Sequence, residues 1–358
     1  TNKTFIKQIG EKDFSSLEKI KEAFSISAVT DIFYNDFFVE YNNLVEAVIN
    51  VNSIEDHNKA RDFVLLFTIR TIFLGFIQKK QWIGDDENFV QNLLNTYKNH
   101  GKIQNTFYKE WVSPLYFESF NHEYVPRSEL PKEINAAYQM APYLNGGLFK
   151  KKDGFDNQGW LIPDKEITKF FDYIFSHSFT IEENSLGDED LQLNPEFLGI
   201  IFERLVNKAN GAVYTPRTEV DLMCRLTLVK WLQKNLKSPI RVDNLYELFF
   251  REGKDEQDQK EGSFSPKEAG EVIELLETLS ICDPAVGSGA FLVGMVQVLD
   301  DVEQKLRRMA GMTSINDFER KKRIISQSLY GVEVKEWAVW ICQLRLWLSL
   351  FIDAPDEL

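Results

Sequence analysis

One stretch constrains this chain more than any other: an apolar run stops at an acidic residue, turns through glycines and resumes as an apolar helix. The stretch is Ile281-Cys282-Asp283-Pro284-Ala285-Val286-Gly287-Ser288-Gly289-Ala290-Phe291-Leu292. Because Gly287 and Gly289 lack a Cβ, the backbone there can adopt positive φ and lie against a ligand. The pattern predicts a strand, a ligand-binding loop and a helix, although such a turn also occurs in α/β proteins without a cofactor.

Two neighbouring segments give the loop a family resemblance. Upstream is Gly211-Ala212-Val213-Tyr214-Thr215-Pro216-Arg217, and downstream is Leu329-Tyr330-Gly331-Val332-Glu333-Val334, a short apolar strand that ends in a carboxylate. Their order resembles the gamma arrangement of S-adenosylmethionine-dependent DNA amino-methyltransferases. The chain looks most like the large bacterial restriction-modification proteins that join an endonuclease to an adenine methyltransferase. Residues 70–74, 142–149 and 194–205 are also similar, so the resemblance covers most of residues 55–352.

The resemblance implies S-adenosylmethionine as the cofactor. The Asp283 to Gly289 loop would bend around its methionine part, Thr215 and Pro216 would flank its carboxylate, and Phe291 would stand near the loop exit. Glu333 would accept hydrogen bonds from the ribose hydroxyls. A structural role is the alternative for Asp283, as a cap of the loop amides, and for Phe291, as a core residue. The candidate cofactor-binding residues are Tyr214, Thr215, Pro216, Asp283, Pro284, Ala285, Gly287, Gly289, Phe291 and Glu333.

The implied reaction is methyl transfer to the N6 amino group of adenine in a specific double-stranded DNA site, with cytosine N4 as the alternative. The target base would be flipped out of the duplex and held beside the cofactor. The family's catalytic tetrapeptide, Asn/Asp-Pro-Pro-Tyr/Phe, does not occur in the sequence. We therefore expect a fragment that is inactive alone, has no catalytic residue of its own and contacts DNA through the full-length protein.

Two functions of other classes remain open. The helical part is also typical of a connector or binding module that couples a nuclease domain to a methyltransferase. Glu333 and Lys335 form Glu-x-Lys, the ending of a metal-dependent nuclease signature. That signature needs a second acidic residue on an adjacent strand, and the preceding strand instead ends at Asp283 in the glycine loop.

Charge and composition limit the partners. The net charge of −14 counts against DNA wrapping over the whole surface, because phosphate contacts need local positive potential. Three local basic patches, residues 150–152, 305–308 and 320–323, are candidates for DNA contact or for solvated faces. The three cysteines, without Cys-x-x-Cys spacing, predict buried free thiols, and the four scattered histidines predict no metal site. With no signal-peptide or membrane-spanning pattern, a cytoplasmic protein is expected.

The spacing of apolar residues predicts an α/β fold with a mainly α-helical N-terminal region. Residues 14–99 have helical spacing, residues 101–187 break into turns and loops rich in Pro, Gly and aromatic residues, and an acidic stretch at 185–190 suggests a boundary. The prediction is a helical connector domain at 1–190, followed at 191–358 by the first part of a Rossmann-like methyltransferase domain. Helices are expected at 194–208, 218–236, 266–279, 289–310, 317–328 and 335–351, strands at 279–283 and 329–334, and a surface loop at 251–268.

Overall fold

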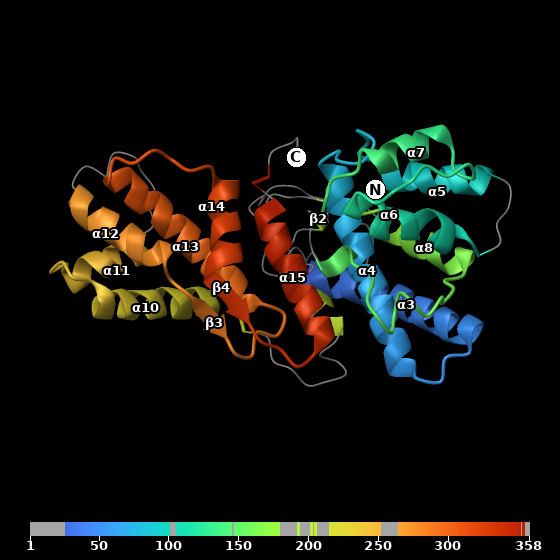
Figure 1. Ribbon diagram of the computed structural model, residues 1–358. Helices are drawn as coiled ribbons and strands as arrows, with labels where there is room; N and C mark the ends of the chain where they lie inside the picture. The colour runs from blue at the N-terminus through green and yellow to red at the C-terminus, as the bar shows by residue number, and fades with distance from the viewer. Residues whose placement is uncertain are drawn as a thin grey trace, which may run out of the picture. The chain divides into compact units, whose positions relative to one another are not determined.

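The chain folds into two compact units. The computed structural model describes residues 26–100, 105–144, 147–179, 192–193, 201–202, 204–205, 215–251, 264–351 and 353–354. The N-terminal unit comprises Thr1–Asn210 with Asp356–Leu358, and the C-terminal unit comprises Gly211–Pro355 (Figure 1). The boundary expected between residues 190 and 191 lies outside the described residues. The division into domains 1–190 and 191–358 therefore stays a prediction.

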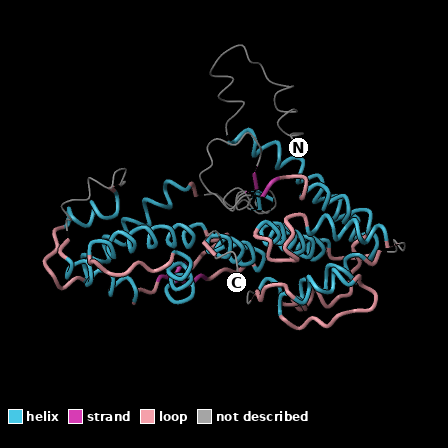
Figure 2. Tube along the Cα trace, turned by 90° about the horizontal axis from the view of Figure 1, so that it is seen from above, coloured by secondary structure: helices cyan, strands magenta, loops and turns pink. Residues whose placement is uncertain are grey.

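Helices dominate the described part of both units, and the strands are short (Figure 2). In the N-terminal unit β1 (Ser178–Phe179) pairs in parallel with β2 (Gln192–Leu193), and in the C-terminal unit β3 (Ile281–Asp283) pairs in parallel with β4 (Leu329–Gly331). The fold is thus mostly helical with little parallel sheet, as predicted in outline. Within the described residues, no helix is both long and apolar enough to span a bilayer.

Helix α4 (His57–Lys79) forms the centre of the N-terminal unit. It begins after Asp56, whose side chain accepts hydrogen bonds from the backbone N–H groups of Asn58 and Lys59, as an N-cap does. Every residue from Phe63 to Gln78 is buried, so the helix is surrounded by protein on all sides. The helix predicted from the spacing of residues 14–99 is therefore found here, and its middle and C-terminal turns lie in the core. Helices α3 (Ile26–Asn52) and α5 (Phe89–Asn99) pack against α4.

Two helices lie where turns and loops were predicted, and there the prediction was wrong. They are α7 (Lys132–Gln139) and α8 (Asp164–Ile174). Helix α8 buries Ile167, Phe170 and Phe171 on one face. Helices this short are marginal in isolation, so packing against the core decides their structure. The other pieces of this stretch are short: the π-helix η1 (Phe107–Val112), α6 (Ser113–Phe117), and the 3-10 turns η2 (Ser119–Asn121) and η3 (Gly147–Phe149).

A buried ion pair ties the segment after η3 to helix α4. The side chains of Arg70 and Asp156 are 1% and 0% exposed. The guanidinium donates to both carboxylate oxygens of Asp156, at 2.7 and 2.8 Å, and its Nε donates to the carbonyl of Leu148 at 2.8 Å. The same guanidinium lies over the ring of Phe117. Since a charge taken out of water needs such partners, Arg70 has a structural role.

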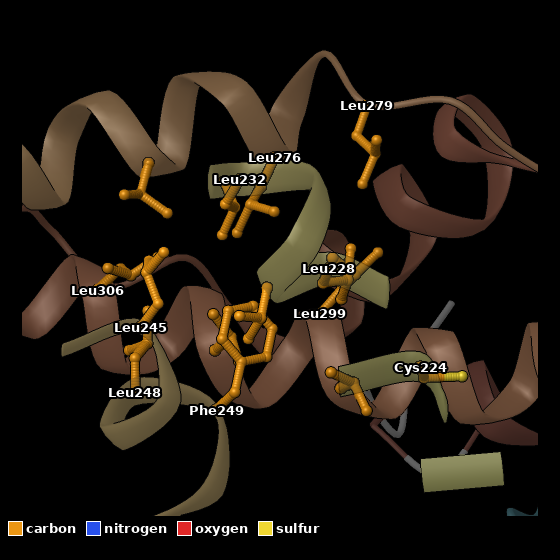
Figure 3. Packing of buried hydrophobic residues seen from close by; sticks show 14 of the residues in the cluster. Cys224, Leu228, Leu232, Leu245, Leu248, Phe249, Leu276, Leu279, Leu299 and Leu306 are labelled. Atoms are coloured by element: carbon orange, nitrogen blue, oxygen red, sulfur yellow. The ribbon is translucent and has the colours of Figure 1, made fainter. Parts of the chain in front are cut away.

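The C-terminal unit is built around α13 (Ala290–Met309), which α10 (Arg217–Asn235) and α12 (Pro266–Glu277) contact along its length. Leucines from these helices pack around Phe249 of α11 (Val242–Phe250) in the core (Figure 3). The unit is completed by α14 (Asp317–Arg323), the π-helical turn η4 (Ile324–Ser328) and α15 (Glu336–Phe351).

Most predicted elements of this unit are found within a few residues of their expected bounds. Helix α11 was not predicted, and the strand expected at 329–334 ends at Gly331. The helix expected at 194–208 and the loop expected at 251–268 lie largely outside the described residues.

The two strands of the C-terminal unit leave one side exposed. Ile281 pairs with Leu329, Cys282 with Tyr330 and Asp283 with Gly331. Because residues paired directly across neighbouring strands project to the same face of a sheet, Cys282 and Tyr330 point to the same side, and both are exposed. The prediction of three buried thiols was therefore wrong for Cys282, whose side of the strand pair is left uncovered by the described elements. Cys224 and Cys342 are buried, and burial raises the pKa of each thiol to about 11.

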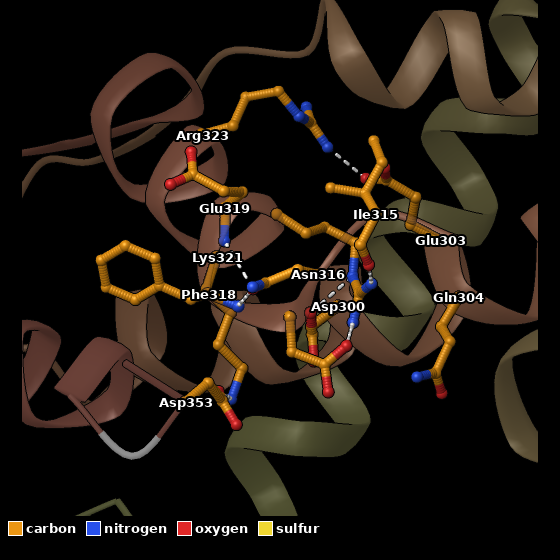
Figure 4. A network of polar contacts seen from close by, with 12 residues as sticks. Asp300, Glu303, Gln304, Ile315, Asn316, Phe318, Glu319, Lys321, Arg323 and Asp353 are labelled. Atoms are coloured by element: carbon orange, nitrogen blue, oxygen red, sulfur yellow. Dashed lines mark hydrogen bonds and ion pairs between the residues drawn. The ribbon is translucent and has the colours of Figure 1, made fainter. Parts of the chain in front are cut away.

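Carboxylates neutralise the basic run at residues 320–323 (Figure 4). Arg320, 1% exposed, pairs with Asp300 at 2.7 Å and with Asp317 at 2.6 Å. Arg323 pairs with Glu303, and Lys321 pairs with Asp353.

The basic run at residues 305–308 is also paired with carboxylates. Lys305 pairs with Asp301, and Arg307 pairs with both Glu303 and Glu277. These contacts favour a structural role for both runs and leave residues 150–152 as the remaining basic candidate.

Candidate functional site

The loop between β3 and α13 is held by the chain segment that follows β4. The Val286 N–H donates to the Val332 carbonyl at 3.0 Å, and the Val332 N–H donates to the Asp283 carbonyl at 2.9 Å. The Gly289 N–H donates to the Val286 carbonyl at 2.8 Å and closes a tight turn. The carboxyl ends of two adjacent parallel strands therefore meet here, which is where α/β sheets place their ligands.

Both glycines of the loop have positive φ, but the space around each of them differs. Gly287 has φ of 53° and Gly289 has φ of 86°, values that disfavour any residue with a Cβ. A Cβ on Gly287 would meet no atom of the described residues within 4 Å, so none of them blocks the approach of a ligand to the backbone there. A Cβ on Gly289 would lie 2.5 Å from the sulfur of Cys342. Gly289 thus permits close packing of the loop on α15, and Gly287 leaves an accessible surface.

Glu333 links the downstream segment to the loop through its side chain. One carboxylate oxygen accepts from the Gly287 N–H at 3.0 Å, and the other accepts from the N–H groups of Val334 and Lys335 at 2.8 and 2.9 Å. An ionised carboxylate offers about four acceptor positions. Three are occupied by the protein's own backbone, so about one remains for a ligand hydroxyl. To accept from both hydroxyls of a ribose, the carboxylate must share or release one of these hydrogen bonds from backbone N–H groups.

These hydrogen bonds lower the pKa of Glu333, the one from the Lys335 N–H most and those from Gly287 and Val334 also. A depressed carboxyl pKa contributes stability that is present above the ordinary glutamate value, about 4.3, and is lost as the pH falls through the lowered value. We expect the Glu333 carboxyl resonance, followed by carbon NMR, to titrate below that ordinary value, with the Gly287 amide shifting in the same step. A Gly287 titration that persisted in Glu333→Gln would contradict this assignment.

The other candidate residues of this loop and of the helix after it differ in their contacts and exposure. The Asp283 side chain accepts from the Ala285 N–H at 3.0 Å, so it caps the loop, and Pro284 and Ala285 are exposed. Phe291 packs against the core, and its carbonyl accepts from the thiol of Cys224 at 3.7 Å. Both observations agree with the structural alternatives for Asp283 and Phe291.

The upstream segment enters helix α10 close to the first turns of α13. Pro216 is the N-cap of α10, Thr215 is partly buried, and Tyr214 lies outside the described residues. A Cβ on Gly294 of α13 would lie 2.5 Å from Val220, so the two helices approach closely one turn beyond Pro216. Thr215 and Pro216 therefore lead into a helix that packs on the helix following the loop.

Two loop contacts were missed by sequence reasoning. Arg345 of α15 donates from Nη1 to the carbonyl of Ser288 at 3.2 Å and to its hydroxyl at 3.3 Å. The signal was an isolated arginine within Trp337 to Leu350, a stretch otherwise almost entirely apolar, because a lone cation in such a helix needs a specific polar partner. The second contact, from the Gly287 N–H to Glu333, depends on a strand pairing that local pattern does not specify.

The nuclease alternative finds little support in the same geometry. The Glu333 carboxylate is turned onto backbone N–H groups, including that of Lys335 itself. A metal site of this kind needs several oxygen ligands converging on one point. Among the residues that the structure describes, no three His, Cys, Asp or Glu side chains gather closely enough to hold a metal ion.

Comparisons with known proteins agree with the expected family. Residues 257–353 match the family model for the DNA-methyltransferase domain of MmeI. A putative type II restriction enzyme and methyltransferase of Methanocaldococcus jannaschii is 28% identical over 364 residues, which cover 98% of this chain. The predicted resemblance to fused restriction enzymes and methyltransferases is confirmed: the chain is related to MmeI-type restriction-modification enzymes, with similarity to a DNA-methyltransferase domain in its C-terminal region.

The likeness extends to a solved structure at the level of the fold. The type IIL restriction-modification enzyme MmeI in complex with DNA aligns with a TM-score of 0.54 at 16% identity, over 88% of this chain and 36% of that one. The chain spans 28% of the length of the Methanocaldococcus relative.

Proposed function

We propose that the C-terminal unit is the S-adenosylmethionine-binding part of a DNA methyltransferase. The observation that carries the proposal is the glycine loop of β3, joined by Gly287 to the carboxylate that follows the adjacent parallel strand. The match of residues 257–353 to a DNA-methyltransferase domain supports it. The Rossmann-like character of the unit belongs to the same proposal.

The residues present fit this cofactor. Gly287 leaves its backbone open to approach, and ribose hydroxyls are donors that the Glu333 carboxylate can accept. The methionine part would lie along Asp283 to Gly289, with Thr215 and Pro216 at its carboxylate and Phe291 beside the loop exit. Tyr214 belongs to the same proposed set of cofactor-binding residues. Pro284 and Ala285, both exposed, would form the outer wall of the loop. When bound, the cofactor supplies a methyl group on a sulfonium; the residues named here hold and orient it.

The proposed acceptor is the N6 amino group of adenine in a specific double-stranded DNA site, and cytosine N4 is the alternative. The sequence contains no Asn/Asp-Pro-Pro-Tyr/Phe tetrapeptide, so we assign the step on the amino group to no residue of this chain. We expect the chain as printed to bind the cofactor without transferring its methyl group. DNA recognition and a fused nuclease activity are proposed for the full-length protein.

A calorimetric titration with S-adenosylmethionine tests the proposal. We expect saturable binding, weakened roughly 10- to 100-fold in Glu333→Gln, which removes the charged acceptor, and in Asp283→Ala, which removes the cap of the loop amides, because a hydrogen bond to a charged group is worth about 1.5–3 kcal/mol. Glu336→Gln is the matched control, since Glu336 is exposed in the first turn of α15, and it should bind as the parent does. A folded parent chain that binds no cofactor would count against the proposal.

The N-terminal unit is proposed to be a helical connector between a nuclease domain and the methyltransferase. The supporting observation is that this unit is compact in itself and has its own core around α4. The buried pair of Arg70 and Asp156 lies within that core.

A further inference from the structure

One face of helix α15 forms a wall against the glycine loop. Cys342 packs with Val286 and Leu292, and Leu346 adds to the same cluster. Gly289 approaches Cys342 so closely that its missing side chain is required there. Arg345, three residues beyond Cys342 on the same side of the helix, reaches the loop between these apolar contacts and donates to Ser288.

The peptide unit between Ser288 and Gly289 is held at both ends. Its carbonyl oxygen accepts from Arg345 Nη1 at 3.2 Å, and its N–H, which belongs to Gly289, donates to the Val286 carbonyl at 2.8 Å. In a trans peptide the carbonyl and the N–H point in opposite directions. The two hydrogen bonds therefore fix the orientation of the whole peptide plane, with its carbonyl turned toward α15.

This peptide would otherwise be easy to rotate. Glycine populates positive and negative φ about equally, and the loop has glycines on both sides of Ser288, each with positive φ. Local sequence alone therefore leaves the direction of the Ser288 carbonyl weakly determined. A rotated peptide would turn an acceptor toward the open side of the loop and present it to the anionic end of an amino-acid ligand.

We propose that Arg345 is a positioning residue that fixes the Ser288–Gly289 peptide and so selects for the methionine part of the cofactor. The proposal rests on the proposed cofactor function. Arg345 acts through the loop, by keeping the Ser288 carbonyl against α15 and the loop amides in the arrangement described above. The consequence is specific: losing Arg345 weakens binding of the ligand's amino-acid end and spares its adenosine end.

The test compares Arg345→Met with the parent chain in two measurements. In ligand-free protein, hydrogen exchange of the Gly287 and Gly289 amides should become about tenfold faster, while amides of α12 and of the middle of α13 stay as protected as before. In calorimetry, the Kd for S-adenosylmethionine should rise by about tenfold, and that for 5′-methylthioadenosine, which lacks the amino-acid end, should change by less than about twofold. Arg345→Lys should restore part of the loop protection, and Arg308→Met, an arginine near the C-terminal end of α13, should match the parent.

Each outcome of these measurements supports or overturns the proposed role of Arg345. Parent-like exchange of both loop amides in Arg345→Met overturns the proposal, as does an equal loss of affinity for both ligands together with faster exchange throughout the unit. A parent chain that binds neither ligand refutes the cofactor function, and the exchange of the loop amides still decides whether Arg345 holds the peptide.

Discussion

Alanine in place of Gly289 should destabilise the C-terminal unit by roughly 2–5 kcal/mol, the sum of about 1–2 for a left-handed residue with a Cβ and 1–3 for overpacking. The backbone there has φ of 86°, and the new Cβ would lie 2.5 Å from the Cys342 sulfur and 3.2 Å from the Cys342 Cα. The backbone of α15 cannot move aside as a flexible side chain could. Urea unfolding followed by pulse labelling of the buried Cys224 thiol, in a Cys282→Ser background, measures the loss.

Gly287→Ala is the matched control, two residues away in the same loop. Gly287 also has positive φ, but its Cβ would meet no atom within 4 Å in the part of the chain that the structure describes, so we expect only the conformational cost of about 1–2 kcal/mol. Adding Cys342→Ala to Gly289→Ala should recover part of the loss, because it removes the sulfur and leaves the backbone contact. Equal destabilisation by the two glycine substitutions would show that the contact with α15 is not what requires Gly289.

Arg70→Met should cost the N-terminal unit about 3–5 kcal/mol, the range found when one partner of a buried ion pair is removed. Asp156 would then remain fully buried with its charge uncompensated, and the carbonyl of Leu148 would lose its donor. The exchange of the slowest α4 amides, measured across a urea series, reports the free energy of unfolding of this unit.

An exposed ion pair of the same helix, α4, serves as the control for the buried pair. Lys79 pairs with Glu87 at 2.8 Å, but their side chains are 44% and 45% exposed, and such surface pairs contribute about 0–1 kcal/mol. Lys79→Met should therefore be nearly neutral. Arg70→Met combined with Asp156→Leu should regain much of the loss, because the unpaired buried charge is then gone. If both single substitutions had similar effects, burial would not be what distinguishes the two pairs.

The sequence predicted the parts of the site that depend on local pattern. The strand, the glycine loop and the helix after it occur at the expected residues, because an apolar run, an acidic stop and two glycines specify them locally. The helical spacing of apolar residues likewise predicted α4, whereas its burial on all sides depends on the elements that pack around it. The exposure of Cys282 could not be foreseen, because it depends on which elements cover one side of a strand pair.

Contacts between distant residues were beyond local reasoning. Arg345 and Ser288 are 57 positions apart, and Gly287 and Glu333 are 46 apart; neither pairing has a local signature. Helices α7 and α8 were missed because aromatic and proline-rich composition suggested loops, while burial of one face stabilises them as helices. The neutralised basic run at 320–323 likewise depends on acidic residues of α13, which lie beside it only in the folded unit.

The same long separations determine when the loop can take shape during folding. Helices α12 and α13 form their own contacts from nearby sequence, whereas the loop between β3 and α13 obtains Glu333 and Arg345 only after a large part of the chain has closed upon it. Closing such long loops costs entropy before any contact compensates it. We therefore expect the loop to be the last part of the unit to order and the first to open. A ligand that binds there would slow the opening of the loop and, with it, the rate at which α15 separates from the loop.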